Sequence, residues 1–522
     1  MMKKLHNVIM SGLITALITA SILFVGMRIF DYFKGADKAI GDIQSSDFIA
    51  PLTRQELKPL NIEIDFLDTH RTLPEVQTEV ETDWGRLTFS TYGASLERMI
   101  AKRHMNGVIQ EIPILFPVAS TSRERHCFLI GLAEKTPYFY DFTGRNDTAN
   151  NIELSYKVDT AETEIRKTFI IHKHINKIDL KLEVTPKGEQ LVGVEPRIVY
   201  PSPFMPDLGA KDAISAVIVD KEGVFKKTLS NSLNMHQGWF GPRIFGSEDK
   251  YFVNTLIGDE HSFVQRAYYN LVGTKDLFSF LEGPVVKEPH TWYLSFYFGP
   301  KEVKSLMAVD DRLEKTLGYS GILAPISRFL LQVLLLLYGY FGNYGWAIVA
   351  LIALMQLIMV PFTFRGEKSN KKAKEFKKKM AYIELRYKND RDALARERAA
   401  LIQAHGMPGL GGCLPVLLFR MPTFFALQQV LSHAIELYKA PFLWISDLSV
   451  PDPYYILPLL VAGGMFAQSL TVESGQRVQF MMIALVMGGV TMSLSAGLAL
   501  YIAVSTALGV LQTAVLRLFK LA

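Results

Sequence analysis

The sequence has little that would support catalysis in water. It has only two cysteines, Cys127 and Cys413, in 522 residues, so no disulfide framework is indicated. It contains no glycine loop with a phosphate-binding lysine, no H-E-x-x-H, no G-x-S-x-G and no C-x-x-C. These absences exclude the common motif-bearing classes of enzyme and metal site, and we expect neither a catalytic activity nor a cofactor.

Charged residues are also scarce. They make up 20% of the chain against 49% hydrophobic residues, and the mean hydropathy is +0.17. A water-soluble surface normally needs more charge, so the composition indicates a membrane protein. The net charge of +5 is too small to indicate DNA binding. Residues 365–405 hold 13 Lys and Arg against 6 Asp and Glu, a balance of +7, which leaves −2 for the rest.

Uncharged runs long enough to cross a membrane lie at both ends of the chain. The first, residues 8–27, follows Lys3 and Lys4, is 20 residues long and can span the ~30 Å hydrocarbon core. Paired lysines place the N-terminus in the cytoplasm, so we interpret residues 1–34 as a retained signal anchor and residues 35–60 as a tether. Further spans are predicted at residues 344–364, 414–437, 456–470, 478–494 and 497–516.

Between the first two spans the hydrophobic pattern changes to period two. Ile178, Leu180, Leu182 and Val184 alternate with polar residues, as do Val76, Thr78 and Val80, and also Leu87 and Phe89. Such alternation predicts antiparallel strands that bury one face, so residues 61–308 are predicted to form a large β-sandwich. His172 and His174 share one face of a predicted strand, but no third ligand lies nearby, and we expect no metal site.

The remaining segments complete the predicted organisation. Residues 309–343 are a connector and an amphipathic helix at the outer membrane interface, because the run 326–338 is short and carries Arg328 and Gln332. Residues 365–405 form a basic helical hairpin that turns at 388–390 in the cytoplasm. Residues 406–516 hold spans three to six, and 517–522 are a cytoplasmic tail. The predicted fold class is a polytopic α-helical membrane protein with six spans and a large all-β domain outside the cytoplasm.

Polar residues inside the spans are the candidate site. Arg420 lies about 9 Å from the cytoplasmic start of the third span, and Gln356 lies about 12 Å from the same surface on the second span. A charge inside a span costs at least ~2.5 kcal/mol and usually faces a polar cavity, so we expect these two side chains to meet. The alternative is that Arg420 snorkels to the headgroups and the other polar groups only join helices. Those other groups include Gln428, Gln429, Ser432, Ser505 and Thr506.

Three motifs resemble one family. The segments A-P-F-L-W-I-S-D-L-S at 440–449 and D-P-Y-Y-I-L-P at 452–458 are similar to the loop between the third and fourth spans of bacterial YidC-type membrane protein insertases. P-G-L-G-G-C-L-P at 408–415 and G-N-Y-G at 342–345 resemble the same family. The likeness covers residues 320–516, while the predicted sandwich matches the Gram-negative form in position and size only.

The resemblance implies a non-enzymatic insertase of the bacterial inner membrane, with its large domain in the periplasm. Spans two to six would enclose a hydrophilic groove that attracts acidic substrate tails, and apolar residues beside it would let transmembrane segments slide into lipid. The implied groove residues are Arg420, Gln356, Gln429, Gln428, Ser432, Thr506, Ser505 and Tyr501. The implied slide residues are Met421, Pro422, Phe424 and Phe425.

The basic hairpin is the family's recruiting element, through Lys371, Lys372, Lys374, Lys377, Lys378 and Lys379. The implied partners are nascent inner-membrane proteins, the ribosome, the Sec translocon, targeting machinery and anionic lipids. From the residues alone, the hairpin charge could equally serve only to orient the chain. One departure concerns the groove, because the family usually has arginine where this chain has Gln356 and glutamine where it has Arg420. Another is Ile502 after Tyr501, where the family often carries a second tyrosine.

Two rival functions remain open from the sequence. A transporter would move a small solute through the polar interior, and it would need a pathway that also opens at the outer face. An envelope enzyme would bind a carbohydrate in the sandwich, and it would need acidic pairs in a cleft.

Overall fold

The computed structural model describes residues 75–518, apart from 106–107, 116–125, 133–138, 161–162, 188–194, 204–213, 234–237, 273–275, 318, 320–322, 388–389, 406–409 and 471–473. The chain divides into two compact units. We call Lys34–Leu317 the sandwich unit, and Met1–Phe33 with Gly318–Ala522 the helical unit. The predicted signal anchor and tether, residues 1–60, lie outside the described residues.

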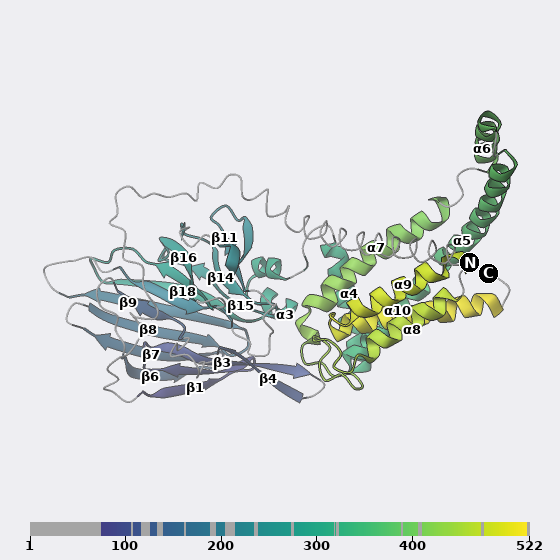
Figure 1. Ribbon diagram of the computed structural model, residues 1–522. Helices are drawn as coiled ribbons and strands as arrows, with labels where there is room; N and C mark the ends of the chain where they lie inside the picture. The colour runs from purple at the N-terminus through teal and green to yellow at the C-terminus, as the bar shows by residue number, and fades with distance from the viewer. Residues whose placement is uncertain are drawn as a thin grey trace. The chain divides into compact units, whose positions relative to one another are not determined.

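The sandwich unit is built from three antiparallel sheets. Their strand orders are β12-β11-β14-β15-β18-β9-β8-β7-β6, β13-β16-β17-β10-β5 and β1-β2-β3-β4 (Figure 1). The strands are β1 (Gln77–Glu81), β2 (Gly85–Ser90), β3 (Ser95–Met105), β4 (Val108–Leu115), β5 (Leu129–Gly131), β6 (Asp141–Asp147), β7 (Asn151–Asp159), β8 (Thr163–His172), β9 (Lys177–Pro186), β10 (Arg197–Pro201), β11 (Ser215–Val219), β12 (Phe225–Leu229), β13 (Gly238–Trp239), β14 (Ile244–Glu248), β15 (Phe252–Asp259), β16 (Arg266–Val272), β17 (Asp276–Glu282) and β18 (His290–Pro300). Short helical segments are η1 (Ser230–Ser232), α3 (Val303–Met307) and η2 (Asp311–Thr316).

The predicted β-sandwich is confirmed. Its core is formed by the apolar residues that alternate with polar residues along the strands. Strand β9 alternates as expected, with Ile178, Leu180, Leu182 and Val184 fully buried. Aromatic residues join the layers: Tyr200 of the five-stranded sheet contacts Phe296 of the nine-stranded sheet edge to face, with ring centroids 5.6 Å apart. Phe89 of the four-stranded sheet packs 4.9 Å from Phe169. The nine-stranded sheet is therefore one layer, and the two smaller sheets share the other.

Three details of the strands differ from the expectation. Val76 precedes β1 and is 52% exposed, whereas Val80 is buried. His174 lies beyond the end of β8 and contacts Asp83, while His172 contacts Asp179, so the two histidines do not share a strand face. The segments η1 and α3 interrupt the all-β pattern, because they are about one turn long and leave no periodicity to detect.

Lys167 is an inward-facing cation that the alternation did not reveal. It is fully buried on β8, and its Nζ donates to the carbonyl oxygens of Gly93, Ala94 and Phe128 at 2.5, 3.2 and 2.7 Å. The ammonium also lies 4.8 Å from the ring centroid of Tyr140. Burial lowers the pKa of Lys167 well below its ordinary value. These three bonds tie β8 to the turn after β2 and to the segment before β5.

A second buried charge cluster lies where the chain leaves the nine-stranded sheet. Glu248 is fully buried, pairs with Lys227 and lies 3.2 Å from the Nζ of Lys301. Beside it, Asp249 accepts from the backbone N–H groups of Tyr251 and Phe252, both at 2.7 Å. Burial raises the pKa of Asp249 to about 6 and lowers that of Lys301 to about 8. The cluster therefore holds the β14–β15 turn to the end of β18.

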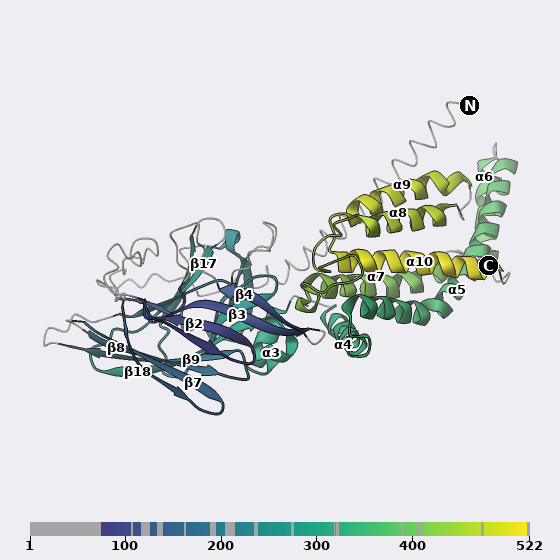
Figure 2. The ribbon, with the colours of Figure 1, turned by 90° about the horizontal axis from the view of Figure 1, so that it is seen from below.

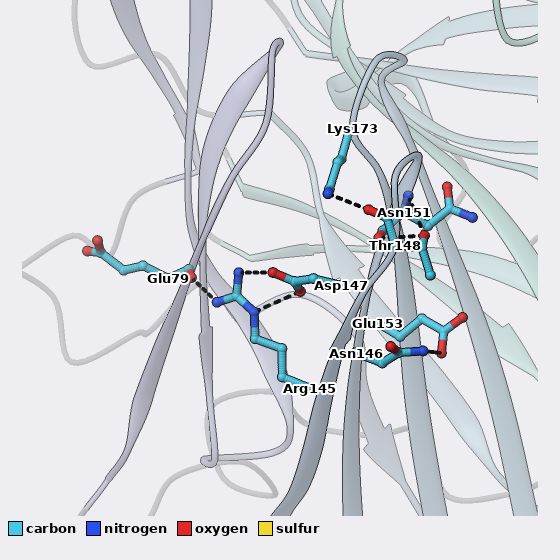
Figure 3. Close-up of polar contacts among 8 residues, drawn as sticks. All are labelled: Glu79, Arg145, Asn146, Asp147, Thr148, Asn151, Glu153 and Lys173. Carbon is cyan, nitrogen blue, oxygen red and sulfur yellow. Dashed lines mark hydrogen bonds and ion pairs between the residues drawn. The ribbon is translucent and has the colours of Figure 1, made fainter.

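The edge strands β6 and β1 are joined by one arginine. Nη1 of Arg145 on β6 donates to the carbonyl oxygen of Glu79 on β1 at 3.2 Å (Figure 3). Asp147 holds the other side of the guanidinium with two bonds of 2.9 Å, and this contact keeps the pKa of Asp147 below its ordinary value. A single side chain thus bridges two sheet edges that share no ladder in the described part of the chain.

In the described residues of the helical unit, helices are joined by loops and no strand is present (Figure 2). Helix α4 packs on α5 and α7, helix α10 packs on α5, α7 and α8, and α8 pairs with α9. Helix α6 packs on the far part of α5. The helices are α4 (Ala324–Phe341), α5 (Tyr344–Arg386), α6 (Arg391–His405), α7 (Leu410–His433), η3 (Ile435–Leu437), α8 (Ile456–Ser469), α9 (Ser474–Thr491) and α10 (Ala496–Leu518).

Several helix bounds differ from the predicted ones. Helix α5 does not end near Phe364 but continues through Pro361 to Arg386, so the predicted second span and the first arm of the hairpin are one helix. The strong helix formers after Pro361 outweigh the lost hydrogen bond. Helix α4 runs through Gly339, since one glycine weakens a helix without ending it, and stops at Gly342, which has φ +65°. Helix α7 ends at His433, four residues before the predicted end of the span.

Two helices among the described residues are both long and apolar enough to cross a membrane, Ala324–Phe341 and Ala496–Val515. Three shorter apolar helical segments are Tyr344–Val360, Ile456–Ser469 and Arg477–Thr491. Helix α4 is thus longer than the 13-residue run from which we predicted an interfacial helix.

Candidate functional site

The polar residues expected in the membrane interior lie on α5, α7 and α10. The chain alternates in direction between α5, α7, α8, α9 and α10, so the helices share two ends. At the loop end lie the starts of α5, α8 and α10 and the ends of α7 and α9. At the hairpin end, α5 continues toward α6 (Figure 2).

A glutamine pair joins α5 to α10. Nε2 of Gln356 donates to Oε1 of Gln512 at 3.0 Å, and both side chains are partly buried. Nε2 of Gln512 is buried and has no hydrogen-bond partner among the described residues. The depth argument expected Gln356 to meet Arg420, but the side chain of Arg420 lies outside the described residues, and the observed partner of Gln356 is Gln512. An unused amide donor in an apolar bundle is a site for a polar group that carries an acceptor.

A second polar contact joins α8 to α10. Nε2 of Gln468 donates to the carbonyl oxygen of Thr506 at 3.3 Å, and the hydroxyl of Thr506 donates to the carbonyl of Ile502 at 2.7 Å. Glycines allow this close approach, because a Cβ at Gly464 would lie 2.7 Å from Cγ2 of Thr506, and one at Gly509 would lie 3.0 Å from Nε2 of Gln468. The sequence reasoning missed Gln468, although it is the only glutamine of α8 and so stands out in an apolar helix.

The polar residues near the end of α7 have different surroundings. Gln429 is 4% exposed, and its Oε1 accepts from the hydroxyl of Ser327 on α4 at 2.8 Å. His433 bonds back to the carbonyl oxygen of Gln429 at 3.0 Å. Gln428 and Ser432 are partly buried on the same helix, and Ser505 is partly buried on α10. The Gln429 amide thus joins α4 to α7 at the loop end.

An aromatic cluster lies between α7 and α10. The ring of Phe424 is 5.4 Å from that of Phe425 and 5.8 Å from that of Tyr501 on α10. Met421 is 40% exposed, and Pro422 is partly buried. The predicted slide residues therefore follow one another on α7, with Tyr501 beside them.

The predicted recruitment residues lie on the far part of α5. Lys378 and Lys379 are exposed. The side chains of Lys371, Lys372, Lys374 and Lys377 lie outside the described residues, although the helix itself is described there. Arg398 of α6 bonds Glu384 of α5 at 2.5 Å, which joins the two arms. No group of three or more metal-ligating His, Cys, Asp or Glu side chains is found where the structure describes the chain.

Comparison with known proteins gives matches along most of the chain. A profile of the YidC periplasmic domain matches residues 77–333, and a profile described as 60Kd inner membrane protein matches residues 336–521. The membrane protein insertase YidC of Cupriavidus necator is 31% identical over 391 residues, which cover 70% of this chain and 68% of that protein. The protein of the same name from Citrifermentans bemidjiense is 28% identical over 452 residues, covering 83% and 84%.

Two solved structures are also similar in part. An active YidC insertase crystal structure with the first transmembrane domain resolved has 16% identity and a TM-score of 0.37, and the match covers 84% of this chain and 92% of that one. A putative aldose 1-epimerase from Escherichia coli has 11% identity and a TM-score of 0.29, covering 44% and 100%. Both scores are too low to support an argument from these structures.

Proposed function

The chain belongs to the YidC family of membrane protein insertases, and on that premise we propose how it inserts its substrates. It is an inner-membrane protein with a periplasmic β-sandwich domain. We assign the N-terminal anchor as the first of six spans and α5, α7, α8, α9 and α10 as the other five. The loop end then faces the periplasm, and the hairpin end and the C-terminus face the cytoplasm. The protein has no catalytic chemistry of its own and requires no cofactor.

The proposed site is a positively charged groove that opens toward the cytoplasm and lipid. The observation that carries it is the glutamine pair, because Gln356 and Gln512 place amides inside apolar helices, and the buried Nε2 of Gln512 has no hydrogen-bond partner among the described residues. Arg420 on α7 supplies the positive charge. An ammonium or guanidinium partly shielded from water attracts a carboxylate more strongly than one in bulk solvent. The groove therefore draws in the acidic tail of a substrate.

Release into lipid follows along α7. Met421, Pro422, Phe424 and Phe425 provide an apolar surface beside the polar groups, and Tyr501 lies next to it. A transmembrane segment gains by leaving a polar groove for hydrocarbon, because its apolar surface no longer faces water. Movement of the short tail and release of the segment are thus driven by charge and by hydrophobicity, with or without the Sec translocon.

The cytoplasmic hairpin recruits the substrate. Lys378 and Lys379 lie exposed on α5, directly after Lys377 and within about two turns of Lys371. Their charge attracts the ribosome, targeting machinery and anionic lipid surfaces, and the strength of this attraction falls with salt. Nascent inner-membrane proteins then reach the groove from the side of the hairpin end.

The experiment that tests the proposed function is depletion of this protein in cells. Small inner-membrane proteins with short acidic tails should then lose protease protection of the tail, and expression of the chain from a plasmid should restore it. Normal insertion of every such substrate after depletion would contradict the proposal.

The proposed topology has a separate test. Asp207→Cys should react with an impermeant thiol reagent in intact cells, whereas Lys377→Cys should react only after the inner membrane is opened, both in a background without Cys127 and Cys413. Labelling of Lys377→Cys in intact cells would overturn the six-span assignment.

A further inference from the structure

The glutamine pair between α5 and α10 has hydrogen-bonding capacity that its own contact does not use. That contact runs from Nε2 of Gln356 to Oε1 of Gln512 at 3.0 Å. Nε2 of Gln512 is buried, and the described ranges of the chain contain no hydrogen-bond partner for it. An amide oxygen has two lone pairs, so Oε1 of Gln356 can accept as well. The pair therefore offers one donor and one acceptor, from two neighbouring helices, to a third group.

The surroundings of the pair are uncharged and apolar. Residues 344–364 and 496–516 contain no Asp, Glu, Lys or Arg. Gln356 lies about 12 Å from the proposed cytoplasmic surface. The nearest large apolar side chains along the two helices are exposed, namely Leu354, Leu357 and Ile358 on α5 and Leu511 and Val515 on α10. A group that binds the pair has therefore left water and must find its hydrogen bonds on the protein.

The donor and the acceptor match the backbone of an extended chain. In an antiparallel β-ladder, one residue presents its N–H and its C=O to the same neighbour, and the two residues exchange both bonds. A carboxylate has only acceptors, so it can use Nε2 of Gln512 but brings no donor for Oε1 of Gln356. A backbone residue uses both atoms. The pair therefore favours backbone over an acidic side chain.

The helical unit already contains a bond of this type. Nε2 of Gln468 on α8 donates to the backbone carbonyl oxygen of Thr506 on α10 at 3.3 Å. A glutamine amide in this bundle thus pairs with a peptide carbonyl. At Gln512 the described residues supply no such carbonyl. An extended polypeptide that enters the groove brings one with every residue.

We propose that Gln356 and Gln512 bind the backbone of the translocating tail, independently of its side chains. Nε2 of Gln512 donates to a carbonyl oxygen of the tail, and Oε1 of Gln356 accepts from one of its N–H groups. The two glutamines are specificity residues that complement Arg420, because the arginine favours acidic tails whereas the amides accept a tail of any sequence. The inference rests on the proposed function and adds the peptide group as a second, uncharged ligand of the groove.

The first test separates backbone from charge. The full-length protein is reconstituted in vesicles of phosphatidylethanolamine and phosphatidylglycerol. The substrate is a single-span peptide whose tail contains only Ser, Thr and Gly, or the same tail with aspartates. Gln512→Met keeps the length of the side chain and removes the amide, so the protease-protected tail should fall about fivefold for both substrates, the effect of one lost hydrogen bond. Arg420→Gln should lower insertion of the acidic tail only.

Thr513→Val is the matched control. Thr513 follows Gln512 on α10, and its hydroxyl donates to the carbonyl of Gly509 at 2.9 Å within the same helix. This variant should insert both tails as well as the unchanged protein does. A loss confined to the acidic tail in Gln512→Met, or no loss for either tail, would overturn the inference alone. If the unchanged protein inserts neither tail above the level of protein-free vesicles, the proposed function fails as well.

The second test changes only the substrate. Methylation of the backbone nitrogens of the neutral tail removes the N–H groups that would bond Gln356 and keeps every side chain. A methylated peptide group loses less hydration on entering hydrocarbon, so the change should not slow insertion into protein-free vesicles. With the unchanged protein, insertion of the methylated tail should fall about threefold or more, because a hydrogen bond to Gln356 is lost. With Gln356→Met the two tails should insert equally. Equal insertion of both tails by the unchanged protein, or the same loss in Gln356→Met, would contradict backbone binding by the pair.

Discussion

The two units of the chain differ in how many large apolar side chains they expose. Among the described residues, seven large apolar side chains are exposed in the sandwich unit and 29 in the helical unit. Leu336, Leu357, Leu459 and Leu485 of the helical unit are 75%, 68%, 66% and 70% exposed. A concentration of exposed large apolar side chains on one unit is typical of a surface that contacts lipid or another protein.

The two units also differ in the charged and polar groups that they bury. The sandwich unit buries charged groups with polar partners, as in the contacts of Lys167 with three backbone carbonyls and of Glu248 with Lys301. In the described part of the helical unit, Gln356 bonds Gln512 and Ser327 bonds Gln429, so these contacts between helices join neutral amides and a hydroxyl. This difference is consistent with the proposal that insertion takes place in the helical unit.

The largest effect should come from Arg420. Arg420→Gln should lower insertion of acidic-tailed substrates about tenfold or more, because an attraction of about 1.4 kcal/mol already corresponds to a factor of ten. Arg420→Lys should keep much of the activity, since capture of a mobile carboxylate needs charge more than a rigid fork. Gln512→Leu separates polarity from charge, because it removes a polar group of the proposed site without changing its charge, and it should lower insertion less than Arg420→Gln does. Protease protection, with protein abundance checked by blot, measures all three.

A smaller effect should come from the hairpin. Replacing its lysines with glutamine should weaken association with ribosomes or anionic vesicles several-fold, and the difference should shrink as salt rises. Several cations remain in the segment, so the topology should not change. Equal binding of the two proteins across a salt series would favour the alternative in which the charge serves only to orient the chain. The replaced residues are Lys371, Lys372, Lys374, Lys377, Lys378 and Lys379.

Deleting the sandwich should have little effect on insertion. Removal of residues 61–298, with the anchor and α4 retained, should change the yield of inserted substrate by less than twofold, since every residue of the proposed groove belongs to the helical unit. Complete loss of insertion at normal protein abundance would show that insertion also requires the sandwich unit, which contradicts the assignment of insertion to the helical unit alone.

The smallest effect on insertion should come from Asp249. Its folded pKa of about 6 lies above the ordinary 3.8, so the folded sandwich binds this proton more tightly than the unfolded chain. The free energy of unfolding should therefore rise as the pH falls from 7 through 6, by at most about 3 kcal/mol, and fall again as the pH is raised. Asp249→Asn, which keeps the acceptor for Tyr251 and Phe252, should flatten this dependence.

Hydrogen exchange of β14 and β15 between pH 5 and 7.5 measures the effect in the full chain. Insertion by Asp249→Asn should equal that of the unchanged protein. A parallel loss of insertion would mean that the two units are coupled.

Much of the fold followed from periodicity, and the failures have physical causes. Ile178, Leu180, Leu182 and Val184 are buried as predicted, because a strand with one covered face must alternate. Lys167 was missed, since its buried charge is satisfied by carbonyls from two distant segments that no local pattern reveals. The predicted helix ends at residues 338 and 364 were wrong, because neighbouring helix formers and packing continue the two helices through Gly339 and Pro361.

The candidate site was predictable by residue type and only partly by pairing. Polar residues in apolar helices pointed to Gln356, Thr506 and Gln429 from the sequence alone. Counting residues along a helix gives the depth of a side chain in the membrane but not the direction in which it points from the helix axis. The sequence therefore could not predict that Gln356 contacts Gln512 or that Gln429 bonds Ser327. Which side chains meet is decided by the crossing of helices, and Gly464 and Gly509 set that crossing between α8 and α10.

The charge exchange between α5 and α7 tests the central claim most directly. If the groove acts by its total charge, Gln356→Arg combined with Arg420→Gln should restore most of the insertion that Arg420→Gln alone removes, measured by protease protection of an acidic tail in cells depleted of the unchanged protein. Normal insertion by Arg420→Gln alone, or a double variant that stays as defective as the single one at equal abundance, would contradict the account.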